Sequence, residues 1–483
     1  MNGGVSVKDI EWKNVSIDYE MIYKMPQVFL KEYGFLPIVD TEGNKAIAIT
    51  RDMTIQFQYE ISKYYKSTPI IYYSKRDELE FNLSYVSAEK SIIAITDEAT
   101  IDENIENADN PVKELYEILL KRAIALKASD IHFEPFEEKT VIRYRVHGKL
   151  MKIREIDNVT YRFLSTTIKI LSNMDISKKY IPHDGKYLIV YNKKNYDLRI
   201  STMPVLYGEK IVVRILNSSD IDLKLESLGF DSSSLNIIRK IINRGEGLFL
   251  VSGPTGSGKT TTLYSIINEI NLKEKNVMTI EDPVEYKING INQINLNTKA
   301  GLTFATGLRN ILRQDPDVIL VGEIRDEETA EIAIKAAITG HIVLSTIHTN
   351  DTISTINRLN NMGIPRHLIV DAISGIISQR LVSKLCECRK KPSKDHINES
   401  KTELELKVGA CNKCIDGYIG RTLVYEMMEM DENVKNQVMS SNFLSKSVLK
   451  ESLNKVTFKE NVKIKYENGE IDAHTYNKFE CLG

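Results

Sequence analysis

The segment that decides the fold is Gly253-Pro254-Thr255-Gly256-Ser257-Gly258-Lys259-Thr260, a glycine-rich stretch that ends in Lys-Thr. An apolar run, 247–252, precedes it, and a segment of helical character follows from Thr261 to Asn271. A glycine-rich turn between a strand and a helix is the context of a phosphate-binding P-loop. Its glycines let backbone N–H groups face phosphate oxygens, and the helix N-terminus adds partial positive charge. The sequence therefore predicts a nucleoside triphosphate site rather than a turn without a ligand.

The P-loop pattern also predicts individual roles. Lys259 should reach the β- and γ-phosphates, and the Thr260 hydroxyl should hold Mg²⁺. ATP and Mg²⁺ are the expected cofactors. The predicted nucleotide-binding residues are Gly253, Pro254, Thr255, Gly256, Ser257, Gly258, Lys259, Thr260 and Thr261.

Length and composition limit the classes of protein that fit. A chain of 483 residues is expected to form about two to four domains. Its hydrophobic content of 42% and charged content of 27% are those of soluble globular proteins. A formal net charge of −2 argues against nucleic acid as the main partner, because phosphate neutralisation needs a basic surface. No apolar stretch approaches the roughly 18–20 residues that span a bilayer, and no signal-peptide pattern is present, so we expect a cytoplasmic protein that meets membranes only peripherally.

Several α/β parts are predicted along the chain. A small N-terminal interaction module is followed by an acidic, weakly apolar segment of the kind found in linkers. An α+β domain and an α/β ATPase core come next, and the core includes a cysteine-rich segment and C-terminal helices. The predicted bounds are 1–95 for the N-terminal module, 96–110 for the linker, 111–226 for the α+β domain and 227–483 for the ATPase core. Within the core, the cysteine-rich segment is 385–421 and the C-terminal helices are 430–483.

Alternation in the α+β domain places arginine on one face of a predicted sheet. The period of two puts Tyr196, Leu198 and Ile200 on one side of a strand and Arg199 on the other. Arginines presented in a row on a sheet suit phosphate or carboxylate recognition. The competing interpretation is a solvated sheet face, which the pattern alone favours.

Three apolar runs of the core each end near a carboxylate or an imidazole, namely Glu281, Glu323 and His348. Ligands of open parallel sheets lie at the carboxyl ends of the strands, so these side chains should converge on the nucleotide. Glu323 is the first choice for activating water and Glu281 the second, and the pair could share Mg²⁺ positioning and proton acceptance. The alternatives are a helix-capping role for either glutamate, and a structural hydrogen bond rather than γ-phosphate sensing for His348.

Four of the five cysteines cluster between positions 386 and 414. This clustering favours a metal site over a disulfide framework. The predicted ligands are Cys386, Cys388, Cys411 and Cys414.

Five segments, in order, resemble the conserved boxes of the secretion ATPases of type II secretion and type IV pilus assembly (GspE/PilB-like). They are TGSGKT (255–260), TIEDPVE (279–285), LRQDPD (312–317), GEIRD (322–326) and TIHTN (346–350). Upstream, ASDIHFEP at 128–135 and GEK at 208–210 match the same family. The resemblance covers residues 110 to 483 strongly and the first 95 loosely.

That resemblance implies a RecA-like P-loop core preceded by an α+β, PAS-like domain. It implies a homo-hexamer that docks on an inner-membrane platform protein and hydrolyses ATP to extrude pilins or pseudopilins. It also implies that Arg199, Arg214, Arg309 and Arg313 reach nucleotide phosphates. Retraction motors among the relatives usually lack both the N-terminal module and the cysteine segment. This chain has both, so it resembles extension motors more than retraction motors.

Two positions depart from the family pattern. His147 stands where the family usually has Asp, and one residue rather than two separates Cys386 from Cys388. Four thiolates still suit tetrahedral Zn²⁺, so zinc is the expected metal, and a segment held by packing alone is the alternative.

A RecA-like nucleic-acid motor is the other functional interpretation of the core. Such a motor needs a basic, aromatic-lined path for a strand. The near-neutral charge and the arginine-bearing second domain favour the secretion motor, and no nucleic-acid partner is expected.

Overall fold

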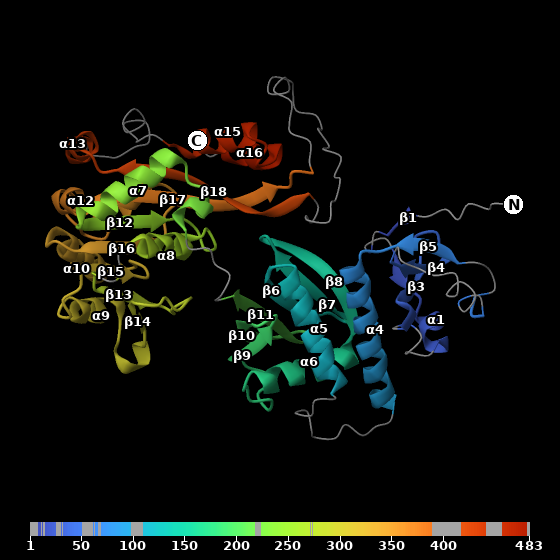
Figure 1. The fold of residues 1–483 in the computed structure, drawn as a ribbon. Coiled ribbons are helices and arrows are strands. Elements are labelled where there is room, and N and C mark those ends of the chain that lie inside the picture. The colour runs from blue at the N-terminus through green and yellow to red at the C-terminus, as the bar shows by residue number, and fades with distance from the viewer. Residues whose placement is uncertain are drawn as a thin grey trace. The chain divides into compact units, whose positions relative to one another are not determined.

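In the computed structural model the chain forms two compact units, residues 1–217 and 218–483 (Figure 1). The first unit thus includes both the predicted N-terminal module and most of the predicted arginine-bearing domain. The described residues are 8–10, 12, 15–25, 30, 32–50, 61, 63–65, 69–97, 110–217, 224–270, 272, 274–388, 417–440 and 456–480.

The first unit begins with a five-stranded sheet of order β1-β5-β4-β3-β2. The central strands β3 and β4 are almost wholly apolar, and Phe35, Leu36 and Ile38 of β3 are fully buried. The elements are β1 (Lys8–Asp9), β2 (Ser16–Ile17), α1 (Tyr19–Lys24), β3 (Phe35–Val39), β4 (Lys45–Ile49), β5 (Ile70–Tyr73) and α4 (Arg76–Asp97).

Helix α4 joins this sheet to the rest of the first unit. The Arg122 guanidinium of α5 lies over the ring of Phe81 in α4, 5.1 Å from the ring centroid. The Arg154 guanidinium of β8 lies over the ring of Tyr85 in α4, 4.7 Å from its centroid. The helix runs to Asp97 and so includes the first two residues of the segment that its acidic, weakly apolar character predicts as a linker. Residues 98–109 of that linker lie outside the described residues.

A six-stranded antiparallel sheet of order β8-β7-β6-β11-β10-β9 completes the first unit. Tyr196, Leu198 and Ile200 of β10 are buried while Arg199 lies on the opposite face, which confirms the predicted alternation. The elements are α5 (Pro111–Ala125), β6 (Ala128–Pro135), β7 (Lys139–Val146), β8 (Lys149–Asp157), α6 (Asn158–Leu171), β9 (His183–Tyr191), β10 (Lys194–Val205) and β11 (Gly208–Asn217).

Capping residues fix the first residue of two helices in this domain. The Asn110 side chain accepts hydrogen bonds from the first turn of α5, and Pro111 occupies the start, where a missing N–H costs nothing. Asp157 caps α6 in the same way. Helix α6 and strand β8 were not predicted from the sequence, because β8 is half-exposed and shows no clean alternation.

The second unit is built on a seven-stranded sheet of order β14-β13-β15-β16-β12-β17-β18. All neighbours are parallel except β17 and β18. The apolar runs of the predicted core are therefore parallel strands, as expected. The strands are β12 (Gly247–Ser252), β13 (Val277–Glu281), β14 (Asn292–Asn295), β15 (Val318–Val321), β16 (Ile342–Ile347), β17 (Ile373–Leu385) and β18 (Tyr418–Glu429).

Helices cover both faces of this sheet (Figure 1). Leu248 and Leu250 of β12 pack in the core under α9 to α13, whereas Phe249 and Val251 pack under α7 and α8. A strand buried on both sides must be apolar throughout, which is why β12 shows no alternation. The helices are η2 (Leu225–Leu228), α7 (Ser232–Arg244), α8 (Lys259–Glu269), η3 (Thr298–Ala300), α9 (Phe304–Ile311), α10 (Glu327–Ile338), α11 (Thr352–Asn361), α12 (Arg366–Ala372), α13 (Glu432–Ser440), α15 (Phe458–Glu467) and α16 (Ala473–Glu480).

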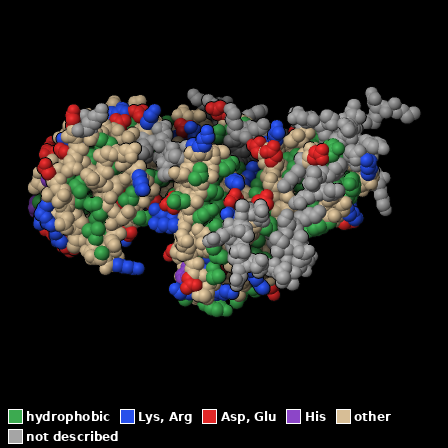
Figure 2. Space-filling model, turned by 60° about the horizontal axis from the view of Figure 1, so that its bottom comes forward, with side chains coloured by type: hydrophobic (Ala, Val, Ile, Leu, Met, Phe, Trp, Pro, Cys, Tyr) green, Lys and Arg blue, Asp and Glu red, His purple; other side chains and the backbone are tan. Residues whose placement is uncertain are grey.

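None of the helices in the described ranges combines the length and the apolar character needed to cross a bilayer. The face in view in Figure 2 carries Lys and Arg side chains interspersed with Asp and Glu. That mixture agrees with the near-zero net charge of the sequence.

Candidate nucleotide site

The P-loop lies where the motif requires it, between the end of β12 at Ser252 and the start of α8 at Lys259. Gly253 has φ +141°, and a Cβ there would lie 2.4 Å from the carbonyl oxygen of Gln379. Only glycine tolerates both that backbone conformation and so close an approach. Thr260 and Thr261 fall in the first turn of α8, at the positive end of the helix dipole.

Lys259 is held against its own loop. Its Nζ donates to the carbonyl oxygens of Gly253, at 2.8 Å, and of Pro254, at 3.1 Å. Burial lowers the pKa of the Lys259 ammonium, and the nearby Glu323 carboxylate opposes that shift. A partly desolvated ammonium beside the loop is a strong binding group for phosphate oxygens.

The structure brings Glu323 and His348 together at the carboxyl ends of β15 and β16. His348 Nε2 lies 3.4 Å from Glu323 Oε2, and the Arg325 guanidinium forms an ion pair with the same carboxylate. Two hydrogen bonds join the strand ends: Ile324 N donates to Thr346 O, at 2.9 Å, and Thr346 Oγ1 donates to Gly322 O, at 2.7 Å. Two of the three strand-end side chains therefore lie together, and their predicted convergence on a nucleotide stays a prediction.

The charges of Lys259, Glu323 and His348 act on one another. Burial lowers the pKa of His348, and the charge of Lys259 lowers it further against the opposing effect of Glu323. His348 is therefore neutral near pH 7, with one ring nitrogen able to donate and the other able to accept. A neutral imidazole beside a carboxylate can orient a phosphate oxygen or a water molecule.

Glu281 has a different environment. Its side chain is nearly fully buried and accepts hydrogen bonds from the Tyr264 hydroxyl, from Thr279 Oγ1 at 2.6 Å and from Gln293 Nε2 at 3.5 Å. Burial raises the pKa of its carboxyl group. Because its carboxyl group is nearly fully buried and bonded to three donors, Glu281 is less accessible to a water molecule than Glu323, whose side chain is 14% exposed.

The first unit contains a cavity of about 380 Å³ that includes two of the predicted arginines. Lys186 pairs with Arg199 across β9 and β10, and Arg199 pairs with Arg214 across β10 and β11. Three cations therefore lie in one row across three neighbouring strands. The cavity is lined by Asp184, Gly185, Lys186, Arg199, Ile200, Ser201, Val212 and Arg214.

Asp130 fixes one end of this row. Its Oδ1 accepts a hydrogen bond from Arg214 Nε at 3.1 Å, and its Oδ2 lies 3.6 Å from Arg145 Nε. Asp130 is buried, whereas the Arg214 side chain stays 64% exposed, so the remaining guanidinium nitrogens are available for a ligand. Sequence reasoning missed Lys186, because its place beside Arg199 depends on a strand register that no local pattern reveals.

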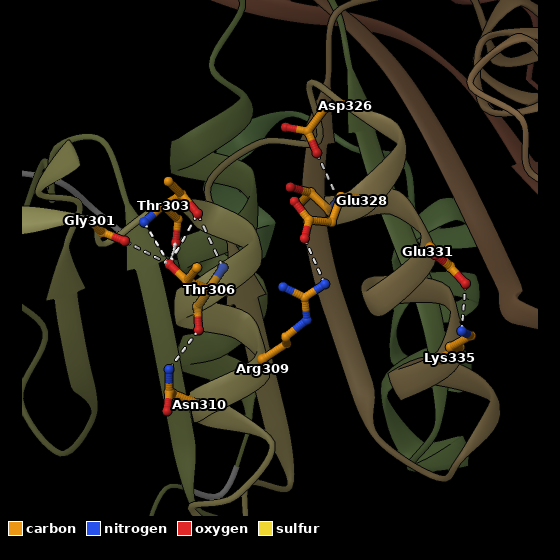
Figure 3. A network of polar contacts seen from close by, with 10 residues as sticks. Gly301, Thr303, Thr306, Arg309, Asn310, Asp326, Glu328, Glu331 and Lys335 are labelled. Atoms are coloured by element: carbon orange, nitrogen blue, oxygen red, sulfur yellow. Dashed lines mark hydrogen bonds and ion pairs between the residues drawn. The ribbon is translucent and has the colours of Figure 1, made fainter.

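Arg309 and Arg313 have their partners on α9 and α10. Arg309 points toward α10, where its Nη2 lies 2.6 Å from Glu328 Oε1 (Figure 3). Arg313 donates to Arg309 O at 3.3 Å and to the side chain of Asn310. The structure does not bring these two arginines to the Glu323 and His348 pair, and their predicted contact with phosphates stays a prediction.

Only half of the predicted cysteine site can be described. Cys386 is buried after β17, and its N–H donates to Gly417 O at 2.8 Å, while Cys388 is exposed. Cys411 and Cys414 lie outside the described residues. Within the described ranges, no three His, Cys, Asp or Glu side chains gather as metal ligands.

Comparison with known proteins agrees with this geometry. The family model described as "Type II/IV secretion system protein" matches residues 105–476, which is most of the chain. The chain belongs to the type II/IV secretion system protein family. It is 41% identical over 364 residues to the type II secretion system protein E of Aeromonas hydrophila, covering 73% of each chain. It is 36% identical over 446 residues to the type IV pilus assembly ATPase PilB of Acinetobacter baylyi, covering 86% of this chain and 76% of that one.

Two solved structures share the fold. The Legionella pneumophila ATPase DotB superposes with a TM-score of 0.59 at 25% identity, over 76% of this chain and 95% of its own. The pilus retraction motor PilT with bound ADP superposes with a TM-score of 0.53 at 27% identity, over 74% of this chain and 95% of its own. By family, the chain is a secretion and pilus-assembly ATPase.

Proposed function

We propose that this chain binds Mg·ATP at residues 253–261 and uses its hydrolysis to drive the assembly of type IV pilins or pseudopilins. The observation that carries the proposal is the meeting of Glu323 and His348 beside Lys259, at the carboxyl edge of a parallel sheet. In the proposed site Lys259 binds the β- and γ-phosphates, and Glu323 accepts a proton from the attacking water. His348 orients the γ-phosphate. Mg²⁺, held by Thr260 with help from Glu323, would neutralise phosphate charge.

The cationic row in the first unit supports a role in phosphate binding. Lys186, Arg199 and Arg214 line one cavity, and their charges exceed that of Asp184, the only acidic residue among the cavity-lining side chains. Cations that contact developing charge accelerate phosphoryl transfer. We propose that Arg199 and Arg214 act on the nucleotide in this way, with Arg309 and Arg313 as further candidates.

Changing both Arg199 and Arg214 to Ala should lower ATP turnover by roughly 10- to 1000-fold, less than the full arginine-finger effect because several cations share the task. Arg214 is mostly exposed, Arg199 is half-buried, and Asp130 keeps Arg145 as a partner, so the fold should survive with some loss of stability. Phosphate release and thermal unfolding of the purified double variant measure the two effects. Lys139→Ala is the matched control, since Lys139 is an exposed cation of the same sheet, paired with Glu155. Unchanged turnover in the double variant would show that the row is only a solvated face.

Assembly and partners are proposed from the family. We propose a RecA-like core, a PAS-like fold for residues 111–226, and a homo-hexamer on the cytoplasmic side of the inner membrane. Its partner there would be a membrane-embedded platform protein. The membership of the chain in a secretion protein family supports these proposals. The mass of the purified protein with and without Mg·ATP, measured by light scattering, tests the ring.

Zinc is proposed for the cysteine segment, with Cys386, Cys388, Cys411 and Cys414 as ligands. A tetrahedral site of four thiolates leaves no open position, so the zinc would hold the segment and take no part in hydrolysis. Elemental analysis of protein purified without chelator should give one Zn²⁺ per chain. Cys386→Ser should lose it, and Cys481→Ser, at the remaining cysteine, should keep it. Zinc well below one equivalent in a folded wild-type protein would rule out the site.

A further inference from the structure

Gln379 of β17 lies directly beside the P-loop. β17 pairs with β12 in parallel, with Ser378 opposite Ser252, so the next residue of β17 is level with the first residue of the loop. The Gln379 side chain is fully buried. Its Nε2 donates to Ser257 O at 2.9 Å, and its Oε1 accepts from Thr262 Oγ1 at 3.0 Å.

These two hydrogen bonds match a carboxamide. One partner is an acceptor and the other a donor, and the amide offers both functions on one planar group without a change of protonation. Burial leaves no water to replace a lost bond, and an unpaired buried polar atom is costly. The fit is also close, because a Cβ on Gly258 would lie 3.3 Å from Nε2.

The bond to Ser257 O determines the direction of a phosphate-binding group. In a trans peptide the C=O and the following N–H point in opposite directions. The Ser257 carbonyl points toward Gln379, so the N–H of Gly258 in the same peptide points away from it. The bond to Thr262 holds the first turns of α8 in the same frame, so that the loop and the helix N-terminus keep one orientation.

We propose that Gln379 is a positioning residue for nucleotide binding: it never touches the nucleotide, and it sets the Ser257–Gly258 peptide so that the Gly258 N–H faces the phosphates. The proposal rests on the proposed P-loop site. It applies to a residue of β17, more than 100 positions away from the loop in the sequence.

The variant Gln379→Glu tests whether nucleotide affinity depends on the hydrogen bond that position 379 donates to Ser257 O. An ionised carboxylate accepts from Thr262 but cannot donate to Ser257 O, whereas a protonated carboxyl group does both. Burial raises the pKa of a carboxyl group, so the protonated form becomes populated as the pH falls. At pH 8 the variant should bind Mg·ATP roughly 10- to 100-fold more weakly than wild type, and this ratio should shrink toward pH 6.

Gln379→Leu removes both hydrogen bonds and should bind weakly at both pH values. Asn461→Asp is the matched control, because Asn461 of helix α15 is also a buried amide of the second unit. Its side chain accepts a hydrogen bond from Tyr425 N at 3.3 Å. Its affinity for Mg·ATP should equal that of wild type at pH 8 and at pH 6. Binding is measured by titration of each folded variant, with folding checked by circular dichroism.

Two outcomes would overturn the proposal. One is wild-type affinity in Gln379→Leu, and the other is a Gln379→Glu to wild-type ratio that does not change with pH. Lys259→Ala, measured in the same series, separates this failure from failure of the site itself. If Lys259→Ala loses Mg·ATP while the Gln379 variants bind normally, only the positioning role is wrong. If Lys259→Ala binds normally, the nucleotide site has been misplaced.

Discussion

Replacing Glu323 with Gln is expected to leave Mg·ATP bound and to lower turnover by roughly 10²- to 10⁴-fold, the usual contribution of a general base. The amide keeps the size of the side chain but cannot accept a proton from water. The site favours this assignment because the Glu323 carboxylate lies beside His348, its charge raises the pKa of Lys259 against the effect of burial, and its side chain is 14% exposed. Single-turnover hydrolysis, measured together with equilibrium binding, separates the chemical step from affinity.

Glu281→Gln is the matched control for this experiment. Glu281 is also a glutamate at a strand end, but its oxygens are bonded to Tyr264, Thr279 and Gln293. Its replacement should destabilise this buried network and change turnover much less than Glu323→Gln does. Normal hydrolysis in Glu323→Gln together with loss of hydrolysis in Glu281→Gln would assign the base to the other carboxylate.

Lys259→Ala is expected to reduce turnover by roughly 30- to 4000-fold. Removing one partner of a buried, hydrogen-bonded charge pair costs roughly 2–5 kcal/mol, and each 1.4 kcal/mol is tenfold in an equilibrium constant. Here the lost partner is the ammonium that now lies 2.8 Å from Gly253 O and that would bind the phosphates. Steady-state phosphate release measures the loss.

Lys275→Ala controls for the general loss of a lysine from the second unit. Lys275 is partly exposed and pairs with Asp317 at 3.1 Å, at the opposite, amino end of β15. Its replacement should leave turnover unchanged. Wild-type turnover in Lys259→Ala would remove the P-loop from the mechanism.

The parts of the site that could be predicted are those in which one local segment carries the signal. The strands β12, β15 and β16 are four to six residues long and mostly apolar, since both faces of each strand are buried. Polar residues that follow such a run must lie at the carboxyl edge of the sheet. Glu323 and His348 were found in this way without any knowledge of strand order.

Other residues could not be predicted because their roles arise from pairing between distant segments. β17 mixes Ser, Gln, Arg and Lys with its apolar residues, so neither its place beside β12 nor the contact of Gln379 with the loop shows in the sequence. Lys186 joins the cationic row only through the register of β9 on β10. The sequence ranked Glu323 before Glu281, but the hydrogen bond from Tyr264 that occupies Glu281 comes from a helix rather than from either strand and shows in no local pattern.

The central claim is that one nucleotide is bound by the P-loop and hydrolysed with Glu323 as the base, and the structure of Glu323→Gln with Mg·ATP tests it most directly. We expect the β- and γ-phosphates within loop 253–260, and Lys259 Nζ on phosphate oxygens instead of on the carbonyls of Gly253 and Pro254. The side chain at position 323 should lie within hydrogen-bond distance of a water molecule in line with the γ-phosphate. A nucleotide bound away from this loop, or a γ-phosphate that faces Glu281 with position 323 turned away, would contradict the account.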